Sequence, residues 1–352
     1  MAITKLDISE FLLRTEGILI LDVRSPSEYN HAHIPGALSL PLFTDEERKI
    51  IGTAYKQKKQ KKAIKIGLES FGKNMLPMVE RVEKILNEKK EPNKEIGLHC
   101  WRGGMRSSSV AWLLNLYGFN VILLNGGYKA YRNWVLTQFE KEYNLIVLSG
   151  YTGSNKTGAL HELERAGQVV IDLEGLAGHK GSAFGNLEMI PQPGQEYFEN
   201  MLAFELNRQN KSDSKLPIWV EAESQRIGMV NIPLPFFKTM RKSTLLFLEV
   251  PFEKRLSFII ENYGQHNKEK IISAILRIKK KLGGLEMKSA INFLLEDDIN
   301  SCFGILLKYY DKLYLKSTNS RDLNQRPIIT IPSESTDRKI NLNKLLEYVH
   351  QR

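Results

Sequence analysis

Residues 99–107 read His-Cys-Trp-Arg-Gly-Gly-Met-Arg-Ser, and they join two segments of different character. The run Ile96–His99 is short and apolar, which is typical of a buried strand. The segment Ser107–Tyr117 has apolar residues at helical spacing, and Gly118 follows it where a helix commonly ends. The stretch therefore predicts a strand, a tight loop and a helix, with Cys100 at the end of the strand.

Similar apolar runs lie on both sides of this stretch. Ile18–Val23 precedes it and Val121–Leu124 follows it, and neither shows the polar alternation of a half-exposed strand. Strands that alternate with helices in this way indicate a parallel α/β domain. We expect this domain to span residues 1–137, with a basic insert near residues 45–75.

A second α/β domain is expected over residues 138–352, because 352 residues are enough for two domains. Its helical additions are expected from Pro251 to about Tyr314, and a short amphipathic helix closes the chain. The expected strands are Leu145–Leu148, Val169–Leu173, Pro217–Glu221, Thr244–Val250 and Arg326–Pro332.

The loop after Cys100 has the residues of an anion cradle. Glycines permit the backbone angles that turn N–H groups inward, and a helix N-terminus adds partial positive charge. Both effects favour the thiolate, which is the nucleophilic form. We therefore predict that Cys100 is the catalytic nucleophile, whereas Cys302 lacks such a setting and is interpreted as structural. Arg102 and Arg106 are predicted to add charge, and the predicted cradle residues are Trp101, Gly103, Gly104, Met105 and Ser107.

A second motif follows the expected strand Leu145–Leu148 and precedes a helix, which is the context of a Walker A phosphate loop. Asn155 stands where that motif has its last glycine. Asparagine is the non-glycine residue that best tolerates left-handed angles, so we expect the loop to be retained. The predicted phosphate-binding residues are Gly150, Gly153, Ser154, Asn155, Lys156 and Thr157.

Two further loops follow expected strands and carry acidic residues. Carboxylates in such positions support Mg²⁺ or act as a base, but they are equally often solvated surface acids. No metal ligand is assigned. The residues of this candidate second site are Asp172, Glu174, His179, Lys180, Ser182, Glu221 and Glu223.

The formal net charge is +10, which favours a polyanionic partner such as nucleic acid or an anionic membrane surface. Two clusters of basic residues are candidates for binding RNA, although most charge runs are solvated helix faces. They comprise Lys56, Lys58, Lys59, Lys61 and Lys62 in the insert, and Arg277, Lys279, Lys280 and Lys281 further on.

The location in the cell is inferred from what the sequence lacks. Two widely spaced cysteines fit a reducing compartment, and the first residues have no signal-peptide pattern. No apolar run approaches the roughly 18 residues of a membrane span. We expect a cytoplasmic protein without a membrane partner.

The first domain resembles the rhodanese fold in the order and spacing of its motifs. They are Asp22-Val-Arg24, Glu28-Tyr29, His33-Ile-Pro-Gly-Ala37, Cys100 and Gly126-Gly-Tyr128. The resemblance implies that Cys100 carries a persulfide or selenosulfide. The Cys-x5-Arg loop is one residue longer than usual in that family and also resembles the phosphatase relatives of rhodanese. A Cys-dependent phosphatase therefore stays open as an alternative.

The whole chain resembles the tRNA 2-selenouridine synthase family, a rhodanese domain fused to a P-loop domain. The most specific segments are Ile51–Gln57, Cys100–Ser107, the P-loop, Asp172–Ser182, Val220–Ser224 and Arg277–Gly284. Asn155, Lys180 and Ala222 depart from the family pattern. The fold implied is a rhodanese-like parallel-sheet domain followed by a P-loop NTPase-like α/β domain.

The resemblance also implies an activity. Members replace sulfur by selenium in wobble 2-thiouridine of tRNA, with selenophosphate as donor, and attach a geranyl group from geranyl diphosphate on the way. Selenophosphate and geranyl diphosphate would both be co-substrates. Binding of Mg²⁺ is compatible with this activity, and no tightly bound cofactor is expected. The partners would be tRNA and an enzyme that produces selenophosphate. The alternative is a rhodanese-like phosphatase or sulfurtransferase fused to a nucleotide-binding regulatory domain.

Overall fold

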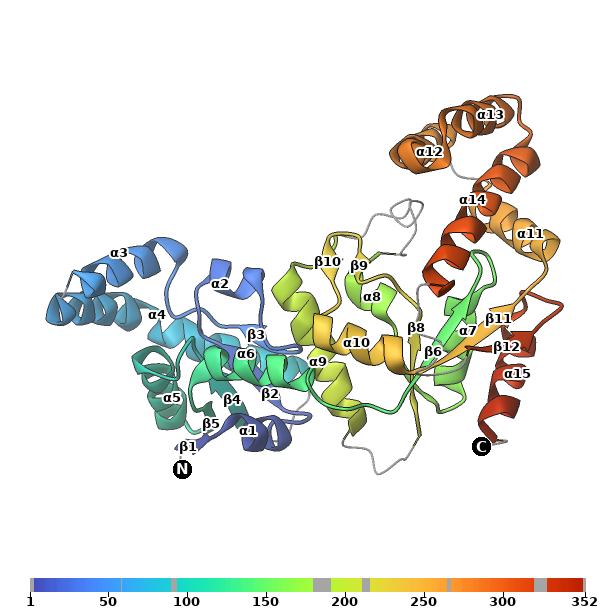
Figure 1. Cartoon of the computed structure of the whole chain (residues 1–352). Helices are drawn as coiled ribbons and strands as arrows, with labels where there is room; N and C mark the ends of the chain where they lie inside the picture. The colour runs from blue at the N-terminus through green and yellow to red at the C-terminus, as the bar shows by residue number, and fades with distance from the viewer. Residues whose placement is uncertain are drawn as a thin grey trace. The chain divides into compact units, whose positions relative to one another are not determined.

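A computed structural model describes residues 3–57, 59–89, 94–179, 191–210, 216–264, 267–319 and 328–350. The chain divides into two units (Figure 1). The first comprises Met1–Gln138 and Glu199–Phe204, and the second comprises Phe139–Phe198 and Glu205–Arg352. We expected every residue after 137 in the second domain, so the assignment of Glu199–Phe204 to the first unit corrects that expectation.

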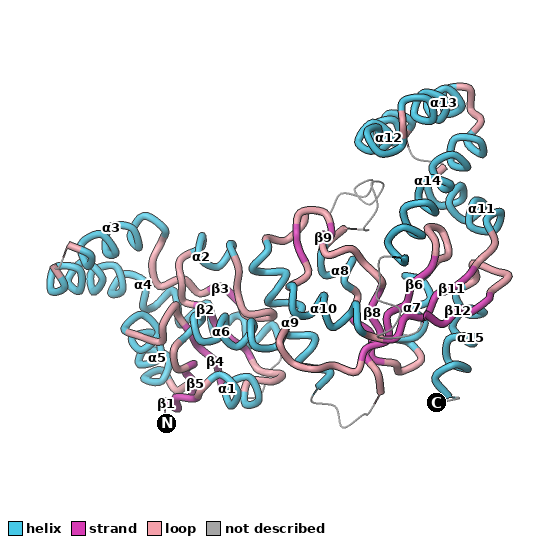
Figure 2. The backbone as a smooth tube through the Cα atoms, viewed as in Figure 1, coloured by secondary structure: helices cyan, strands magenta, loops and turns pink. Residues whose placement is uncertain are grey.

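The first unit is built on a five-stranded sheet (Figure 2). Its strands have the order β1-β5-β4-β2-β3, and every pairing is parallel. Its central strands are the apolar runs predicted above, and their side chains are almost completely buried. The strands are β1 (Ile3–Leu6), β2 (Leu19–Asp22), β3 (Leu38–Ser39), β4 (Glu95–His99) and β5 (Asn120–Leu124).

The helices of the first unit include the one predicted after the Cys100 loop, which runs from Met105 to Tyr117 and ends at Gly118 with φ +111°. Its Val110 and Leu114 are fully buried, whereas Tyr117 is exposed and donates to Glu83. The helices are α1 (Ile8–Arg14), α2 (Pro26–His31), α3 (Asp45–Lys56), α4 (Gln60–Lys89), α5 (Met105–Tyr117) and α6 (Gly127–Gln138).

The basic insert forms α3 and the first part of α4. A capping box starts α3, in which the Thr44 hydroxyl accepts from the Glu47 N–H and the Glu47 carboxylate accepts from the Thr44 N–H. Figure 1 shows α3 standing apart from the strands of this unit. The insert is therefore a helical pair beside the sheet.

The second unit has a parallel sheet in the order β12-β11-β6-β8-β7, so the strand that leads into the phosphate loop lies at its centre. Leu173 was expected to end a strand, but it begins a helix because Asp172 caps the N-terminus there. The strands of this sheet are β6 (Leu145–Gly150), β7 (Val169–Ile171), β8 (Ile218–Glu221), β11 (Thr244–Glu249) and β12 (Ile328–Pro332), while β9 (Arg226–Ile227) and β10 (Val230–Asn231) form a separate antiparallel pair.

The helices of the second unit form two groups. One group lies along the sheet, and α11 to α14 pack on one another around a separate apolar cluster that contains Cys302 (Figure 1). No described helix combines the length and apolarity needed to cross a membrane. The helices are α7 (Lys156–Arg165), α8 (Leu173–Ala177), α9 (Gln195–Asn210), α10 (Leu234–Lys242), α11 (Phe252–Tyr263), α12 (Lys268–Leu282), α13 (Gly284–Leu295), α14 (Ile299–Asn319) and α15 (Arg338–His350).

Candidate functional site

The loop that carries Cys100 runs from the end of β4 to the start of α5 and encloses the thiol. Cys100 is only 3% exposed. The Ser107 hydroxyl donates to Cys100 Sγ over 3.2 Å, and the backbone N–H groups of Arg102 and Ser107 also donate to the sulfur. Gly127 must be glycine here, because it has φ +61° and a Cβ would collide with the Cys100 carbonyl oxygen.

The surroundings of Cys100 favour the thiolate. Burial raises the pKa of the Cys100 thiol, but the hydrogen bonds from Ser107 and Arg102 and the charge of Arg106 lower it by more. The net pKa therefore lies below its ordinary value. Of the two arginines assigned to this site, Arg106 acts on the sulfur through its charge and Arg102 through its backbone N–H.

Arg106 is oriented by a carboxylate from α2. Its Nη1 donates to Glu28 Oε2 over 2.8 Å, and both side chains are mostly buried. Burial raises the pKa of Glu28, but the hydrogen bond and charge of Arg106 lower it below its ordinary value. The ion pair keeps the guanidinium beside the cradle. Glu28 was quoted above only for its part in the resemblance, and its pairing with Arg106 was not predicted.

A buried ion pair lies at the ends of the strands beside Cys100. Arg24 Nη2 and Asp22 Oδ2 are 2.6 Å apart, and each side chain is at most 1% exposed. The Arg24 guanidinium stacks on the Tyr128 ring, 3.8 Å from its centroid. His99 Nδ1 lies 3.8 Å from Asp22, but burial lowers the pKa of His99 and favours the neutral ring. The Asp-x-Arg motif therefore has a structural role that its sequence spacing alone did not reveal.

The segment Glu199–Phe204 of α9 completes this unit. Asn200 is fully buried, and its Nδ2 donates to the His33 carbonyl and to the Tyr128 hydroxyl, each over 2.8 Å. The Tyr128 N–H in turn donates to the Cys100 carbonyl over 2.8 Å. A single residue, Tyr128, thus connects Asn200 to the Cys100 loop. No local motif in the sequence marked Asn200.

The phosphate loop joins β6 to α7 with the strand and helix that the motif requires. Asn155 has φ +58° and ψ +40°, so it adopts the left-handed conformation proposed for it. Its Nδ2 donates to the Thr336 carbonyl over 2.8 Å, a bond that glycine could not make. Arg255, from α11, donates to the Thr152 carbonyl and pairs with Asp311. Neighbouring segments therefore anchor the loop at Thr152 and at Asn155.

Lys156 and Thr157 face the end of β8. Lys156 Nζ lies 3.6 Å from Glu221 Oε1, and the Thr157 hydroxyl donates to Glu221 Oε2 over 3.2 Å. Burial lowers the pKa of Lys156, but the Tyr314 phenol oxygen and nearby carboxylates raise it by more, so the ammonium stays charged. A cation at the start of α7 suits an anionic ligand. Ser154, also assigned to this loop, is fully buried.

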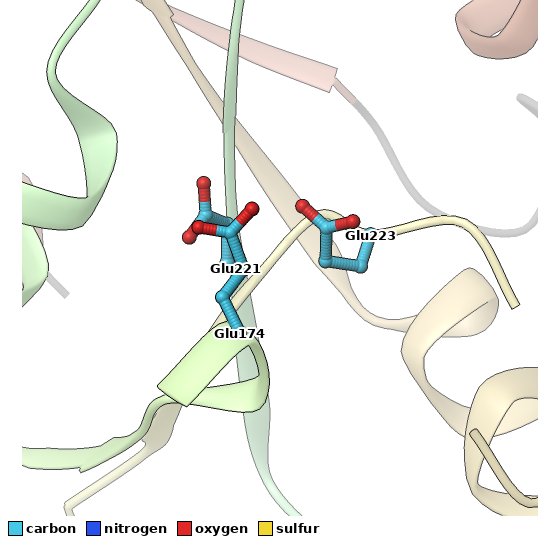
Figure 3. Close-up of side chains that lie close together, drawn as sticks. All are labelled: Glu174, Glu221 and Glu223. Atoms are coloured by element: carbon cyan, nitrogen blue, oxygen red, sulfur yellow. The ribbon is translucent and has the colours of Figure 1, made fainter. Parts of the chain in front are cut away.

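Three glutamates lie close together (Figure 3), and one of them is Glu221, the partner of Lys156. Glu174 comes from α8, while Glu221 and Glu223 come from the end of β8 and the residues after it. Their nearest oxygens all lie within 4.8 Å of one another. Burial and the charges of Glu221 and Glu174 raise the pKa of Glu223 well above its ordinary value. Hard oxygen ligands in this arrangement, with the Thr157 hydroxyl adjacent, fit Mg²⁺.

The other residues of the candidate second site lie apart from this cluster or outside the described residues. Asp172 caps α8 by accepting from the Gly175 N–H over 2.8 Å. The His179 N–H donates to the Glu174 carbonyl, which places His179 just past the end of α8. Lys180 and Ser182 lie outside the described residues.

The basic residues assigned to RNA binding are exposed wherever the structure describes them. Lys56 ends α3, while Lys59, Lys61 and Lys62 lie at or just before the start of α4. None of these four pairs with an acidic side chain among the described residues, and Lys58 lies outside them. Further along, α12 carries four exposed basic residues, Arg277, Lys279, Lys280 and Lys281.

These two sites define a class of protein in which a rhodanese-like domain with a cradled cysteine is joined to a P-loop domain. Residues 9–133 match the rhodanese-like domain, and residues 143–330 match the tRNA 2-selenouridine synthase AAA domain. A tRNA 2-selenouridine synthase of Nitrosomonas europaea is 32% identical, with 87% of this chain and 90% of that protein covered. One of Hydrogenovibrio crunogenus is 37% identical, covering 76% and 77%. The chain belongs to the tRNA 2-selenouridine synthase family.

Proposed function

We propose that this enzyme replaces sulfur by selenium in wobble 2-thiouridine of tRNA, with selenophosphate as the selenium donor and a geranylated base as intermediate. The observation that carries the proposal is the cradled Cys100. Its hydrogen bonds from Ser107 and from backbone N–H groups suit a phosphate-bearing donor next to a thiolate. The Cys100 thiolate would attack the phosphorus of selenophosphate, so that the P–Se bond breaks and selenide leaves to attack the base. Water would then hydrolyse the S–P bond of the phosphorylated cysteine and release phosphate.

The second unit would supply the geranyl group. Lys156, at the start of α7, would bind the diphosphate of geranyl diphosphate. Glu174, Glu221 and Glu223 would hold Mg²⁺, which neutralises diphosphate charge when bound. The sulfur of 2-thiouridine would form a bond to the first carbon of the geranyl group. The bond between that carbon and the diphosphate oxygen would break, and diphosphate would leave. The alkylated sulfur is then a better leaving group when selenium attacks.

Mass spectrometry of wobble nucleosides tests this proposal. Cells that lack the gene, grown with selenite, should regain 2-selenouridine when they express the wild type or Cys302→Ser, because Cys302 lies in an apolar core. Cells that express Cys100→Ser should not. A normal level of 2-selenouridine with Cys100→Ser would refute the role of Cys100. Hydrolysis of a phosphate monoester that depends on Cys100 would instead favour the phosphatase alternative.

The role of the P-loop is tested separately. Lys156→Ala should weaken binding of geranyl diphosphate by roughly ten- to a hundredfold, because a hydrogen bond to a charged group contributes about 1.5–3 kcal/mol. Isothermal titration with geranyl diphosphate measures this. Lys238→Ala, an exposed lysine of α10, is the matched control. Unchanged binding in Lys156→Ala would remove the P-loop from geranyl transfer.

A further inference from the structure

The mouth of the Cys100 loop combines exposed apolar and cationic side chains. Trp101 is 37% exposed and Met105 is 56% exposed. Arg102, next to Trp101, and Lys129, at the start of α6, are also exposed. Backbone groups and Ser107 surround the sulfur, so binding a small anion there makes no use of the indole.

The Trp101 side chain is held in place rather than loosely attached. Its ring lies 5.7 Å from the Tyr128 ring, centroid to centroid. Its carbonyl accepts from the Lys129 N–H over 2.9 Å, and Tyr128 itself is fully buried between Arg24 and Asn200. A fixed aromatic ring with more than a third of its surface in solvent is suited to stacking against a flat ligand.

We propose that Trp101 is the stacking platform for the unpaired RNA base that Cys100 modifies. This rests on the proposed function, in which tRNA is the substrate. Cys100 is only 3% exposed, so a base within a stacked helix cannot reach it, whereas a single unstacked base can enter edge-on. Aromatic side chains hold such bases in RNA-binding proteins, and the charges of Arg102 and Lys129 suit the flanking phosphates. Trp101 is therefore a positioning residue.

Binding of an anticodon stem-loop that contains 2-thiouridine tests the platform in the full-length protein. Trp101→Ala should weaken the Kd by roughly 5- to 150-fold, since stacking on one aromatic side chain is worth that much. Trp101→Phe keeps a ring and should stay within about threefold of the wild type. Trp112→Ala is the matched control, because Trp112 is 52% exposed on α5, the helix that follows the loop, and lies two turns from its start. It should bind like the wild type.

A second measurement separates stacking from damage to the loop. The rate at which iodoacetamide alkylates Cys100 should be the same in Trp101→Ala and the wild type, because the cradle uses backbone groups and Ser107. Equal stem-loop affinity in Trp101→Ala and the wild type would overturn the platform, even if the wild type produces 2-selenouridine. So would equal losses in Trp101→Phe and Trp101→Ala. Binding that depends on Trp101 in a protein that makes no 2-selenouridine would instead overturn the proposed function alone.

Discussion

At the scale of single residues, the protonation of Cys100 depends on the groups around its sulfur. Burial alone would keep the thiol protonated, and donors such as the Ser107 hydroxyl reverse that preference. Removing a donor to the thiolate must therefore raise the pKa of Cys100. The fraction of thiolate at neutral pH then falls, because a higher pKa favours the protonated thiol.

Ser107→Ala should accordingly slow alkylation of Cys100 at pH 7 by about three- to tenfold, the value of one hydrogen bond. The rate as a function of pH should move its midpoint upward. Cys302 does not interfere, because burial raises its pKa to about 11. Ser109→Ala, in the same helix, serves as the control. An unchanged pH profile in Ser107→Ala would mean that the hydroxyl does not stabilise the thiolate.

Asn155 combines two effects that substitutions can separate. Its left-handed backbone favours glycine, while its side chain makes a hydrogen bond to Thr336. Asn155→Ala loses that bond and adds strain, so it should lower the free energy of unfolding by about 2 kcal/mol. Asn155→Gly relieves the strain and should cost about 1 kcal/mol or less. Urea denaturation measures both, and equal losses would show that the backbone angle is not limiting.

At the scale of elements, α9 contains residues of both units, and its buried Asn200 belongs to the first. Asn200→Ala removes the hydrogen bonds to the Tyr128 hydroxyl and the His33 carbonyl. The variant should lose about 1–3 kcal/mol of stability, the contribution of two hydrogen bonds. Asn207→Ala, on the same helix but without a described side-chain hydrogen bond, should lose much less. Urea denaturation of both variants makes the comparison, and similar losses would contradict the role of Asn200.

At the scale of the whole molecule, the net charge of +10 makes binding to tRNA depend on salt. Lys59, Lys61 and Lys62 are exposed and share the start of the insert helix, though not all on one face. Replacing the three by alanine should lower tRNA affinity and reduce the slope of log affinity against log salt by about 1–2. Alkylation of Cys100 should not change.

The control for this prediction carries the same loss of charge elsewhere. Lys238, Lys242 and Lys312 are exposed lysines of the second unit outside the predicted clusters. If the position of the lysines matters more than the net charge, the variant with all three replaced by alanine should keep the wild-type slope of log affinity against log salt. Filter binding at several salt concentrations gives both slopes. If the insert variant matches the wild type, the tRNA site must lie on other residues.

The sequence could predict whatever depends on local spacing. The strand that precedes Cys100, the glycine loop and the helix after it follow from apolar periodicity and glycine positions, and the structure has all three. The central strand before the P-loop was predicted in the same way. Short edge strands such as β1 and β3 were missed, because so few residues carry no clear period.

By itself, therefore, the sequence determined two α/β units, a cysteine loop and a phosphate loop, because each is a continuous segment with its own hydrogen-bonding and apolar pattern. Only the tertiary structure paired Arg106 with Glu28, brought Glu174 to Glu221 and Glu223, and placed Asn200 beneath Tyr128. These contacts join residues far apart in the chain. They depend on how helices pack against the sheet, and no local period or motif encodes that packing.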